Sequence, residues 1–443
     1  MADTAPPRRR RRWPLYVAAG LAIAIAFAAW QLSSAKLAKT ILDRAGPAFG
    51  LELAFEGTPS YSLRPEPRLS LPGFVARQPG AETPLLTADR LELSLPWSTI
   101  TGDAAAPKVI TRIDLDTPVL DLAALAAWQA TRPDTPFEVP TLTDGIGVDD
   151  GTIVGDGWRL TGVELALPHL SAGRPAEAAL AGRLERGTLR LGFEGDVALA
   201  SAGLESPVRL DLEGTLATGG DPMPWTLELA GALDATGTPL RVDAARAKAT
   251  GTVDVGEKRA AWILATTLDA AIGDATTIDL ADAAFRGDEP LPELLFDAHG
   301  VIDERLHVDA GGAMARWPGG WPTLPPPLSA TRPMSFVLGY DGGTDFAAPL
   351  RLRVTRDGTR LDVRAEVPEV LAWMDRDDAS PLPPVEGSFT TPTLTVGAFT
   401  LDGVRVEFDD GDGVDAAGPF AGVRGRVDST EDEREARDAD ASP

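Results

Sequence analysis

The densest group of chemically capable side chains is an acidic run near the C-terminus, residues 409–415 (DDGDGVD). Its four aspartates supply the carboxylate oxygens that Ca²⁺ takes as ligands. The run does not match the twelve-residue, helix-flanked calcium loop, because no glutamate closes it. A solvated acidic loop is therefore the favoured interpretation, and weak Ca²⁺ binding is the alternative.

Other residues suited to catalysis or metal binding are sparse. The chain has no cysteine, and its three histidines lie far apart without the spacing of metal ligands (His169, His299 and His307). Residues 145–147 (GIG) resemble part of a phosphate loop, but no third glycine and no helix follow, which favours a hairpin turn. There is also no Gly-x-Ser-x-Gly motif. We therefore expect no enzymatic activity, no metal site and no cofactor.

The charge balance argues against a nucleic-acid partner. Lys and Arg number 41 against 66 Asp and Glu, which gives a net charge of −25. The first twelve residues hold five arginines, so the rest of the chain is more acidic still. Affinity for nucleic acid depends on Lys and Arg meeting phosphates. The 44% hydrophobic content predicts a folded body.

A basic head precedes an apolar run. Residues 15–32 (LYVAAGLAIAIAFAAWQL) carry no charge, and 18 residues is at the short end of what spans a bilayer. By the positive-inside rule, residues 1–14 are cytoplasmic, 15–32 form a transmembrane helix, and the body lies across the membrane. The topology signal is Arg8, Arg9, Arg10, Arg11 and Arg12. A cleaved signal peptide is the alternative, because residues 33–35 (SSA) are a passable cleavage site.

The sequence after the apolar run predicts β-strands. Alternation of apolar and polar residues recurs from Leu51 onward, for example at 91–95 (LELSL), 163–167 (VELAL), 208–212 (VRLDL) and 350–354 (LRLRV). Alternation with a period of two residues gives each strand one apolar and one solvent-exposed face. We expect a mostly β fold of about 20–25 antiparallel strands in one long, curved, groove-like sheet with few short helices. Packing of its apolar face as a filled sandwich remains equally open.

Turns, helices and the tail complete the assignment. Asp-Gly pairs punctuate the alternating runs and predict hairpin turns (Asp150-Gly151, Asp156-Gly157, Asp341-Gly342, Asp357-Gly358 and Asp402-Gly403). The clearest hairpin spans 350–363. Short helices are expected at 122–130 and 367–374. Residues 428–443 contain no apolar residue larger than alanine, and we expect a disordered acidic tail there.

After the apolar run come the segments 37–45 (LAKTILDRA), 51–57 (LELAFEG), 61–71 (YSLRPEPRLSL), 86–97 (LTADRLELSLPW) and 110–122 (ITRIDLDTPVLDL). The order of these segments over residues 15–215 resembles the AsmA family of inner-membrane-anchored envelope proteins. Residues 149–167 resemble the two-strand phrase that the family repeats, and 393–408 resemble a late phrase of that kind. The resemblance lies in phrase order and not in a catalytic motif.

This resemblance implies that residues 33–427 form a periplasmic, β-rich domain that binds or guides phospholipid. It implies a role in phospholipid transport or in outer-membrane assembly and homeostasis, with the inner membrane and envelope proteins as partners. Residues expected to line a groove for acyl chains are Leu91, Leu93, Leu95, Ile113, Leu115, Val163, Leu165 and Leu167. A structural subunit of an envelope machine, similar to the type II secretion protein N, is the alternative function, and an exported hydrolase is a third.

Overall fold

The computed structural model describes most of the chain between residues 39 and 424. The described residues are 39, 42–43, 46–47, 50–101, 109–131, 139–218, 221–237, 239–255, 258–273, 275–319, 321, 328, 332–343, 346–374, 384–396, 399–408 and 423–424. The basic head, the apolar run 15–32, the acidic run 409–415 and the tail 428–443 lie outside them. Within the described part of the chain, no helix has the length and apolarity needed to cross a bilayer.

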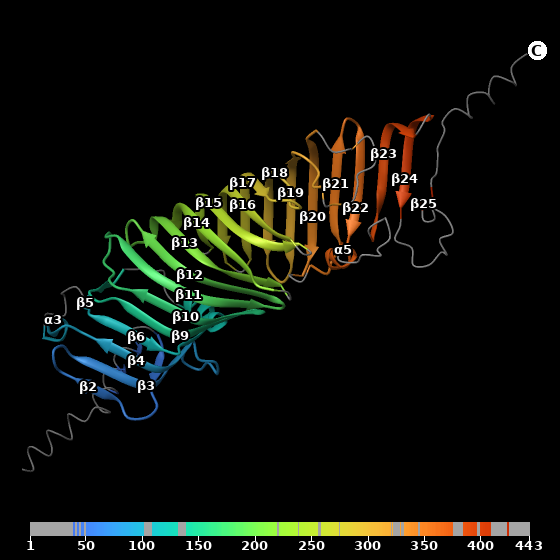
Figure 1. Ribbon diagram of the computed structural model, residues 1–443. Helices are drawn as coiled ribbons and strands as arrows, with labels where there is room; N and C mark the ends of the chain where they lie inside the picture. The colour runs from blue at the N-terminus through green and yellow to red at the C-terminus, as the bar shows by residue number, and fades with distance from the viewer. Residues whose placement is uncertain are drawn as a thin grey trace, which may run out of the picture. The chain divides into compact units, whose positions relative to one another are not determined.

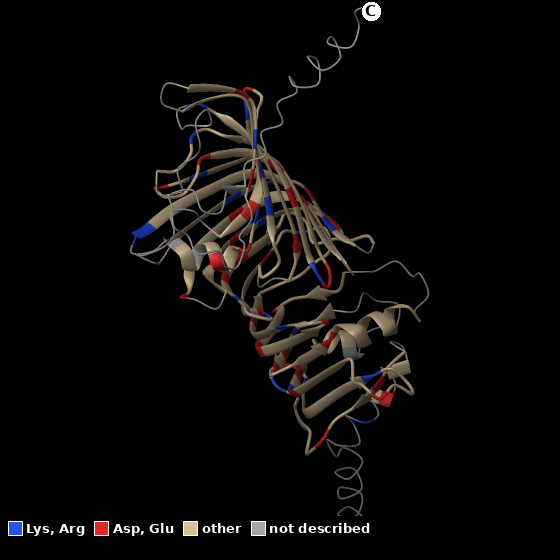
Figure 2. Ribbon diagram, turned by 90° about the vertical axis from the view of Figure 1, so that its right-hand side faces the viewer, with Lys and Arg blue, Asp and Glu red and all other residues tan. Residues whose placement is uncertain are grey.

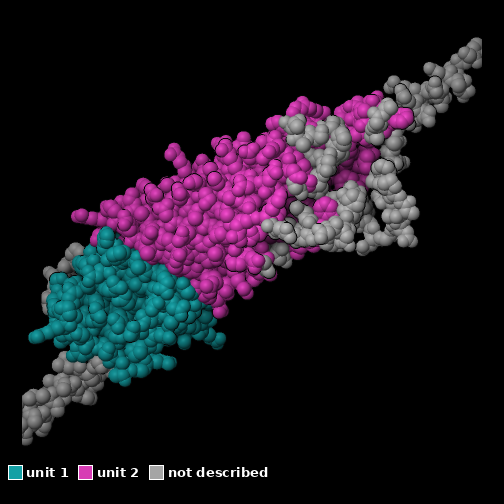
Figure 3. All heavy atoms as spheres, in the orientation of Figure 1, with its two compact units in different colours: residues 1–156, 162–169 teal, residues 157–161, 170–443 magenta. Residues whose placement is uncertain are grey.

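The chain divides into two compact units (Figure 3). Unit 1 comprises residues 1–156 and 162–169, and unit 2 comprises residues 157–161 and 170–443. Most described residues of the chain lie in β-strands, and the helices are short. The prediction of a mostly β protein with few short helices is therefore confirmed.

Unit 1 is a small sheet with two short helices (Figure 1). Its elements are β1 (Glu52–Ala54), β2 (Ser60–Ser62), β3 (Arg68–Arg77), β4 (Leu86–Ser94), α3 (Trp97–Thr101), β5 (Val109–Ile110), β6 (Arg112–Asp116), β7 (Val119–Asp121), α4 (Leu122–Gln129), β8 (Thr141–Leu142) and β9 (Ile146–Gly155), and residues 162–167 of β10 (Trp158–Leu167) also belong to it. Antiparallel pairing joins β1 and β2 to β3, β3 to β4, and β4 to β6 and β7.

The prediction of a wholly antiparallel sheet is wrong in unit 1. Strands β6 and β7 both run parallel to β9, and β5 runs parallel to β8. A parallel pair needs a crossover, which the segment containing α4 supplies between β7 and β9. Asp121, the last residue of β7, is also the N-cap of helix α4. Its carboxylate accepts a 2.8 Å hydrogen bond from the Ala124 amide.

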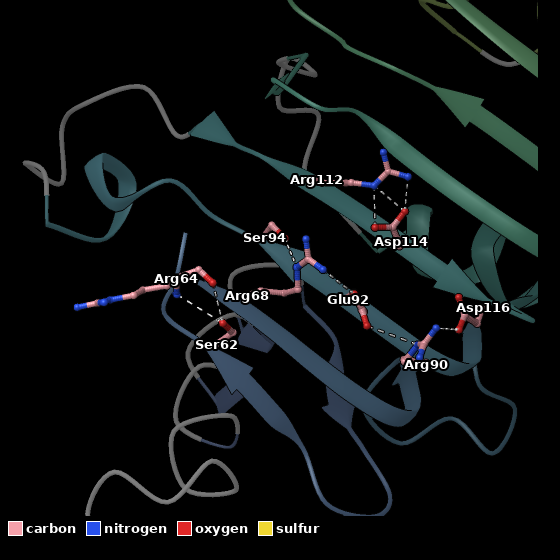
Figure 4. Close-up of polar contacts among 9 residues, drawn as sticks. All are labelled: Ser62, Arg64, Arg68, Arg90, Glu92, Ser94, Arg112, Asp114 and Asp116. Atoms are coloured by element: carbon pink, nitrogen blue, oxygen red, sulfur yellow. Dashed lines mark hydrogen bonds and ion pairs between the residues drawn. The ribbon is translucent and has the colours of Figure 1, made fainter. Parts of the chain in front are cut away.

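The two faces of the unit 1 sheet differ in chemistry. On one face, Leu71, Leu91 and Leu115 lie side by side on β3, β4 and β6, and Leu91 and Leu115 pack against a buried cluster that includes Leu42 and Phe74. The other face carries ion pairs between neighbouring strands and within them (Figure 4): Arg68–Glu92, Arg90–Asp116 and Arg112–Asp114. The sheet thus has one apolar and one solvent-exposed face, as the alternation of residues predicts.

Unit 2 is a succession of antiparallel strands, each paired with the next along the chain (Figure 1). They are β11 (Ala176–Arg186), β12 (Leu189–Leu199), β13 (Glu205–Thr218), β14 (Met223–Asp234), β15 (Leu240–Val255), β16 (Lys258–Ile272), β17 (Thr276–Gly287), β18 (Leu294–Ile302), β19 (Leu306–Met314), β20 (Met334–Gly342), β21 (Leu350–Arg356), β22 (Thr359–Ala365), β23 (Val385–Val396), β24 (Phe399–Phe408) and β25 (Val423–Arg424), with α5 (Val367–Met374) between β22 and β23.

The Asp-Gly pairs divide into turns and positions inside strands. Asp357 and Gly358 form the predicted tip between β21 and β22, both with positive φ (51° and 82°), as a type I′ turn requires. Gly157 likewise has positive φ between β9 and β10. Asp150 and Gly403, however, lie inside β9 and β24, so those two hairpin predictions are wrong. Asp150 and Gly403 have positive φ within their strands (50° and 65°), so the dipeptide and its backbone conformation alone do not identify a hairpin turn.

Candidate functional site

One face of the unit 2 sheet carries apolar side chains that lie in register from strand to strand. The clearest row takes one residue from each strand between β13 and β20: Leu212, Leu227, Ala249, Leu264, Phe285, Leu294, Met314 and Met334. Side chains opposite one another on adjacent strands lie about 5 Å apart and touch. The row is therefore a continuous apolar track perpendicular to the strands.

A second row continues the same face further along the sheet. It consists of Leu268, Leu280, Ala298, Ala310, Leu338, Leu352 and Val363, on β16 to β22. We call the side of β11 to β22 that carries both rows the inner face. Its polar counterpart is the outer face.

The inner face is only partly buried along β11 to β18. The fully buried apolar residues of these strands are all alanines: Ala176, Ala178, Ala245, Ala247, Ala260 and Ala283. The larger inward side chains, such as Leu227, Leu264 and Phe285, are half-buried. In a filled sandwich such Leu and Phe side chains would be among the most buried residues. No second layer formed by described residues therefore covers this stretch.

The far end of the inner face is filled. Met314, Leu328, Met334, Phe336, Val354 and Phe389 form a buried cluster. Leu328 and Val354 have no exposed surface. Trp317 and Trp321 pack against the cluster, with ring centroids 5.0 Å apart in an edge-to-face arrangement. The part of the inner face around these residues is therefore filled, whereas β11 to β18 hold no buried apolar residue larger than alanine.

The sheet of unit 2 is curved, as Figure 1 and Figure 2 show. Arg186, at the end of β11, donates a hydrogen bond from Nη2 to the carbonyl of Asp303, in the turn between β18 and β19. These residues are 117 positions apart in the sequence. The contact brings opposite ends of the open stretch together, which a flat sheet of the intervening strands would not allow.

Bulges with a repeated pattern bend the strands. The register shifts between Val242 and Ala245 on β15 and between Leu280 and Ala283 on β17. At each bulge a residue with positive φ donates its amide to a carboxylate on the next strand: Ala244 N to Asp269 Oδ1 at 2.6 Å, and Asp282 N to Asp297 Oδ1 at 2.9 Å. The amide that leaves the ladder is thereby satisfied. Bulges increase local bend and twist, so these carboxylates help to set the curvature.

The outer face carries charged side chains at solvent-exposed positions. Exposed pairs such as Arg209–Asp211 and Arg259–Asp254 lie at 2.8 and 2.9 Å. The hydrogen bond from Arg259 lowers the pKa of Asp254, and the hydrogen bond to Asp211 raises the pKa of Arg209. Such exposed pairs contribute little to stability. Among the described residues, no group of three or more His, Asp or Glu side chains has the arrangement of a metal site.

The groove-lining residues predicted from the sequence all lie on half-buried positions near or in unit 1 strands. Leu91 pairs with Leu115, and Leu93 pairs with Ile113. Leu95 follows β4. Val163, Leu165 and Leu167 lie on β10, which pairs with β9. The β-carbon of Val163 is the neighbour that a side chain at Gly151 of β9 would meet at 3.2 Å. The structure thus brings Leu91, Leu93, Ile113 and Leu115 together, and it does not give them the extended open surface of the unit 2 inner face.

The residues of that inner face were missed by sequence reasoning, except for the alternation at 208–212 and at 350–354. Two bulges account for part of the omission. Each one shifts the phase of the apolar and polar alternation within β15 and β17, so a continuous face does not appear as a continuous period of two.

Comparison of the chain with protein-family models, with curated proteins and with solved structures gave no match. The assignment to the AsmA family therefore stays a prediction.

Proposed function

We propose that this chain is an envelope protein that binds phospholipid acyl chains along the inner face of unit 2. In this proposal residues 15–32 anchor the chain in the inner membrane and the body is periplasmic. The chain then contributes to phospholipid transport or to outer-membrane assembly and homeostasis. The observation that carries the proposal is the in-register apolar row from β13 to β20, whose large side chains stay half-buried up to β18.

The dimensions of the row suit an acyl chain. The half-buried part of the row runs from β13 to β18, and five strand spacings of about 4.8 Å make it roughly 24 Å long. The acyl chains of one leaflet span about half of a hydrocarbon core roughly 30 Å thick. Each methylene removed from water stabilises the bound chain by about 0.8 kcal/mol. A continuous apolar track therefore supports binding without any catalytic group.

The test places a photo-crosslinking amino acid at one inward and one outward position of β14 in the full-length chain. Leu227 points to the inner face, and Ala230 lies on the outer face of the same strand. Irradiation in cells, followed by mass spectrometry, should yield phospholipid adducts at position 227 and none above background at position 230. Equal adduct yields at the two positions, or no lipid adduct at position 227, would refute the proposal. Because adducts are mapped to β14, lipid held by residues 15–32 does not contribute.

A second candidate, a scaffolding role in a protein assembly of the envelope, is favoured by one observation. Leu295, Val337 and Ile263 are exposed on the outer face by 62, 52 and 47%. Leu295 lies between Ala284 and Ala313 on the neighbouring strands. Leu295 and the two alanines opposite it form a small apolar surface, and exposed apolar surface can mark a protein contact. A crosslinker at position 295 that yields a discrete protein adduct, while position 227 yields no lipid, would support this role over lipid binding.

A further inference from the structure

Charged side chains are nearly absent from the inner face, and those present are cationic. Between β11 and β19, the inward positions of the described residues carry two charges, Arg186 at the end of β11 and Lys258 at the start of β16. Lys258 is exposed, whereas Arg186 is half-buried. The chain as a whole has a net charge of −25, so an inner face without carboxylates is a specific feature of this surface.

Arg186 stands where the two ends of the open stretch meet. Its Nη2 donates to the Asp303 carbonyl, and among the described residues its other guanidinium N–H groups have no protein acceptor. A guanidinium offers five donors in a planar fork that matches phosphate oxygens. Arg186 can therefore keep its carbonyl contact and still bind a phosphate at the edge of the apolar track.

The turn that Arg186 reaches is acidic. The Asp303 carboxylate accepts a 2.7 Å hydrogen bond from the amide of Arg305, and the Arg305 guanidinium is held by Asp341 at 2.8 Å. The Glu304 carboxylate, by contrast, is exposed and has no hydrogen bond or ion pair among the described residues. Arg186 thus contacts the backbone of Asp303, the residue next to Glu304 with its exposed carboxylate. We call this junction of the end of β11 with the β18–β19 turn the mouth of the inner face.

We infer that this mouth recognises the headgroup of a zwitterionic, amine-bearing phospholipid. The inference rests on the proposed function. Arg186 binds the phosphate, the carboxylate of Glu304 binds the ammonium group, and the acyl chains lie on the inner face along β11 to β18. An anionic phospholipid without an amine would satisfy Arg186 and leave Glu304 facing an anion, which disfavours it.

The experiment uses the full-length chain in mild detergent with three diazirine-acyl lipids in equal amounts. The lipids are a phosphatidylethanolamine, a phosphatidylglycerol and a diacylglycerol with the same acyl chains. Adducts on peptides of β13 to β17 are quantified by mass spectrometry. The wild-type chain should favour phosphatidylethanolamine over both others. Arg186→Gln should lower the ratio of phospholipid to diacylglycerol adducts roughly tenfold, as expected for a lost charge-assisted hydrogen bond. Glu304→Gln should remove the preference for phosphatidylethanolamine over phosphatidylglycerol.

Matched controls lie on the same strand. Arg183→Gln and Glu185→Gln alter outward, exposed side chains of β11 and should leave every ratio unchanged. If Arg186→Gln lowers all three adducts equally, Arg186 is only a structural brace, and the inference is wrong. A wild-type chain that prefers phosphatidylglycerol, or shows no headgroup preference, also overturns it while the acyl-binding proposal stands. Absence of all three lipids from β13 to β17 overturns the proposed function itself.

Discussion

The carboxylate that satisfies the β17 bulge offers a sharp test of how the sheet is bent. Asp297 on β18 accepts a 2.9 Å hydrogen bond from the Asp282 amide, and Asp282 has a φ of 51°. Asp297 is opposite Gly311 on β19, so its removal relieves no directly opposed charge on that strand. We expect Asp297→Ala to free the bulge amide without disturbing the rest of the ladder.

The expected magnitude follows from the geometry. Hydrogen bonds to charged groups contribute about 1.5–3 kcal/mol, and the exposure of Asp297 reduces this to about 1 kcal/mol. Since 1.4 kcal/mol corresponds to a factor of ten, the loss should speed local opening about fivefold. Asp297→Asn keeps a neutral acceptor and should produce a smaller change.

Hydrogen exchange with mass spectrometry on the full-length chain measures this local opening. The amide exchange of residues 280–283 should accelerate in Asp297→Ala, while peptides of β12 and β13 remain unchanged. Glu213→Ala serves as the control, because Glu213 is an exposed outward carboxylate without a hydrogen bond among the described residues. Unchanged exchange at 280–283, or a uniform increase over all of unit 2, would show that Asp297 does not hold the bulge.

Three further predictions concern the same sheet. Leu328→Ala should destabilise the chain by about 3 kcal/mol because Leu328 has no exposed surface, whereas Leu227→Ala should destabilise it clearly less because Leu227 is half-buried. Thermal unfolding of both variants measures the two losses of stability. Equal losses would contradict the open inner face. Gly214→Ala should disrupt the β12–β13 pairing, because the new β-carbon would lie 1.9 Å from the Gly192 carbonyl oxygen. The β-sheet signal in circular dichroism and the unfolding temperature should both fall. A fully stable variant would be inconsistent with the register. Burial tends to raise the pKa of Asp362, but hydrogen bonds from Arg360 and Arg353 outweigh it and lower that pKa below 3.8. A carboxylate with a lower pKa in the folded chain than in the unfolded chain stabilises the fold at pH values above its unfolded-state pKa, and this contribution is lost as the pH falls through its folded-state pKa. Asp362→Asn should therefore cost up to about 0.5 kcal/mol of stability at pH 7 and progressively less as the pH falls below the unfolded-state pKa. A cost that does not change with pH would contradict this.

Local sequence signals predicted much of the secondary structure. Alternation at 350–354 and the Asp357-Gly358 tip gave a correct hairpin, because a type I′ turn and two half-buried strands are both local properties. The helices α4 and α5 were likewise expected where they occur. The parallel pairing of β6 and β7 with β9 was not expected, since pairing partners across a crossover leave no mark on the period of either strand.

The location of the candidate site also could not be predicted from single segments of the sequence. Sequence reasoning chose Leu91 and Leu115 from the most regular alternation, and the structure packs both against the buried cluster of unit 1. The inner face of unit 2 combines residues from many strands, and bulges interrupt its period. Which Leu or Phe becomes part of a track depends on register, and register is fixed between strands and not within one.

The sequence by itself therefore determined the β-rich class, the division of most strands into one apolar and one polar side, and the absence of cysteine chemistry, because composition and side-chain period act locally. The tertiary structure alone decided which apolar faces are filled and which stay open, and which distant residues, such as Arg186 and Asp303, meet. These outcomes depend on strand register and on curvature accumulated over many strands, and neither quantity is encoded in any single segment of the chain.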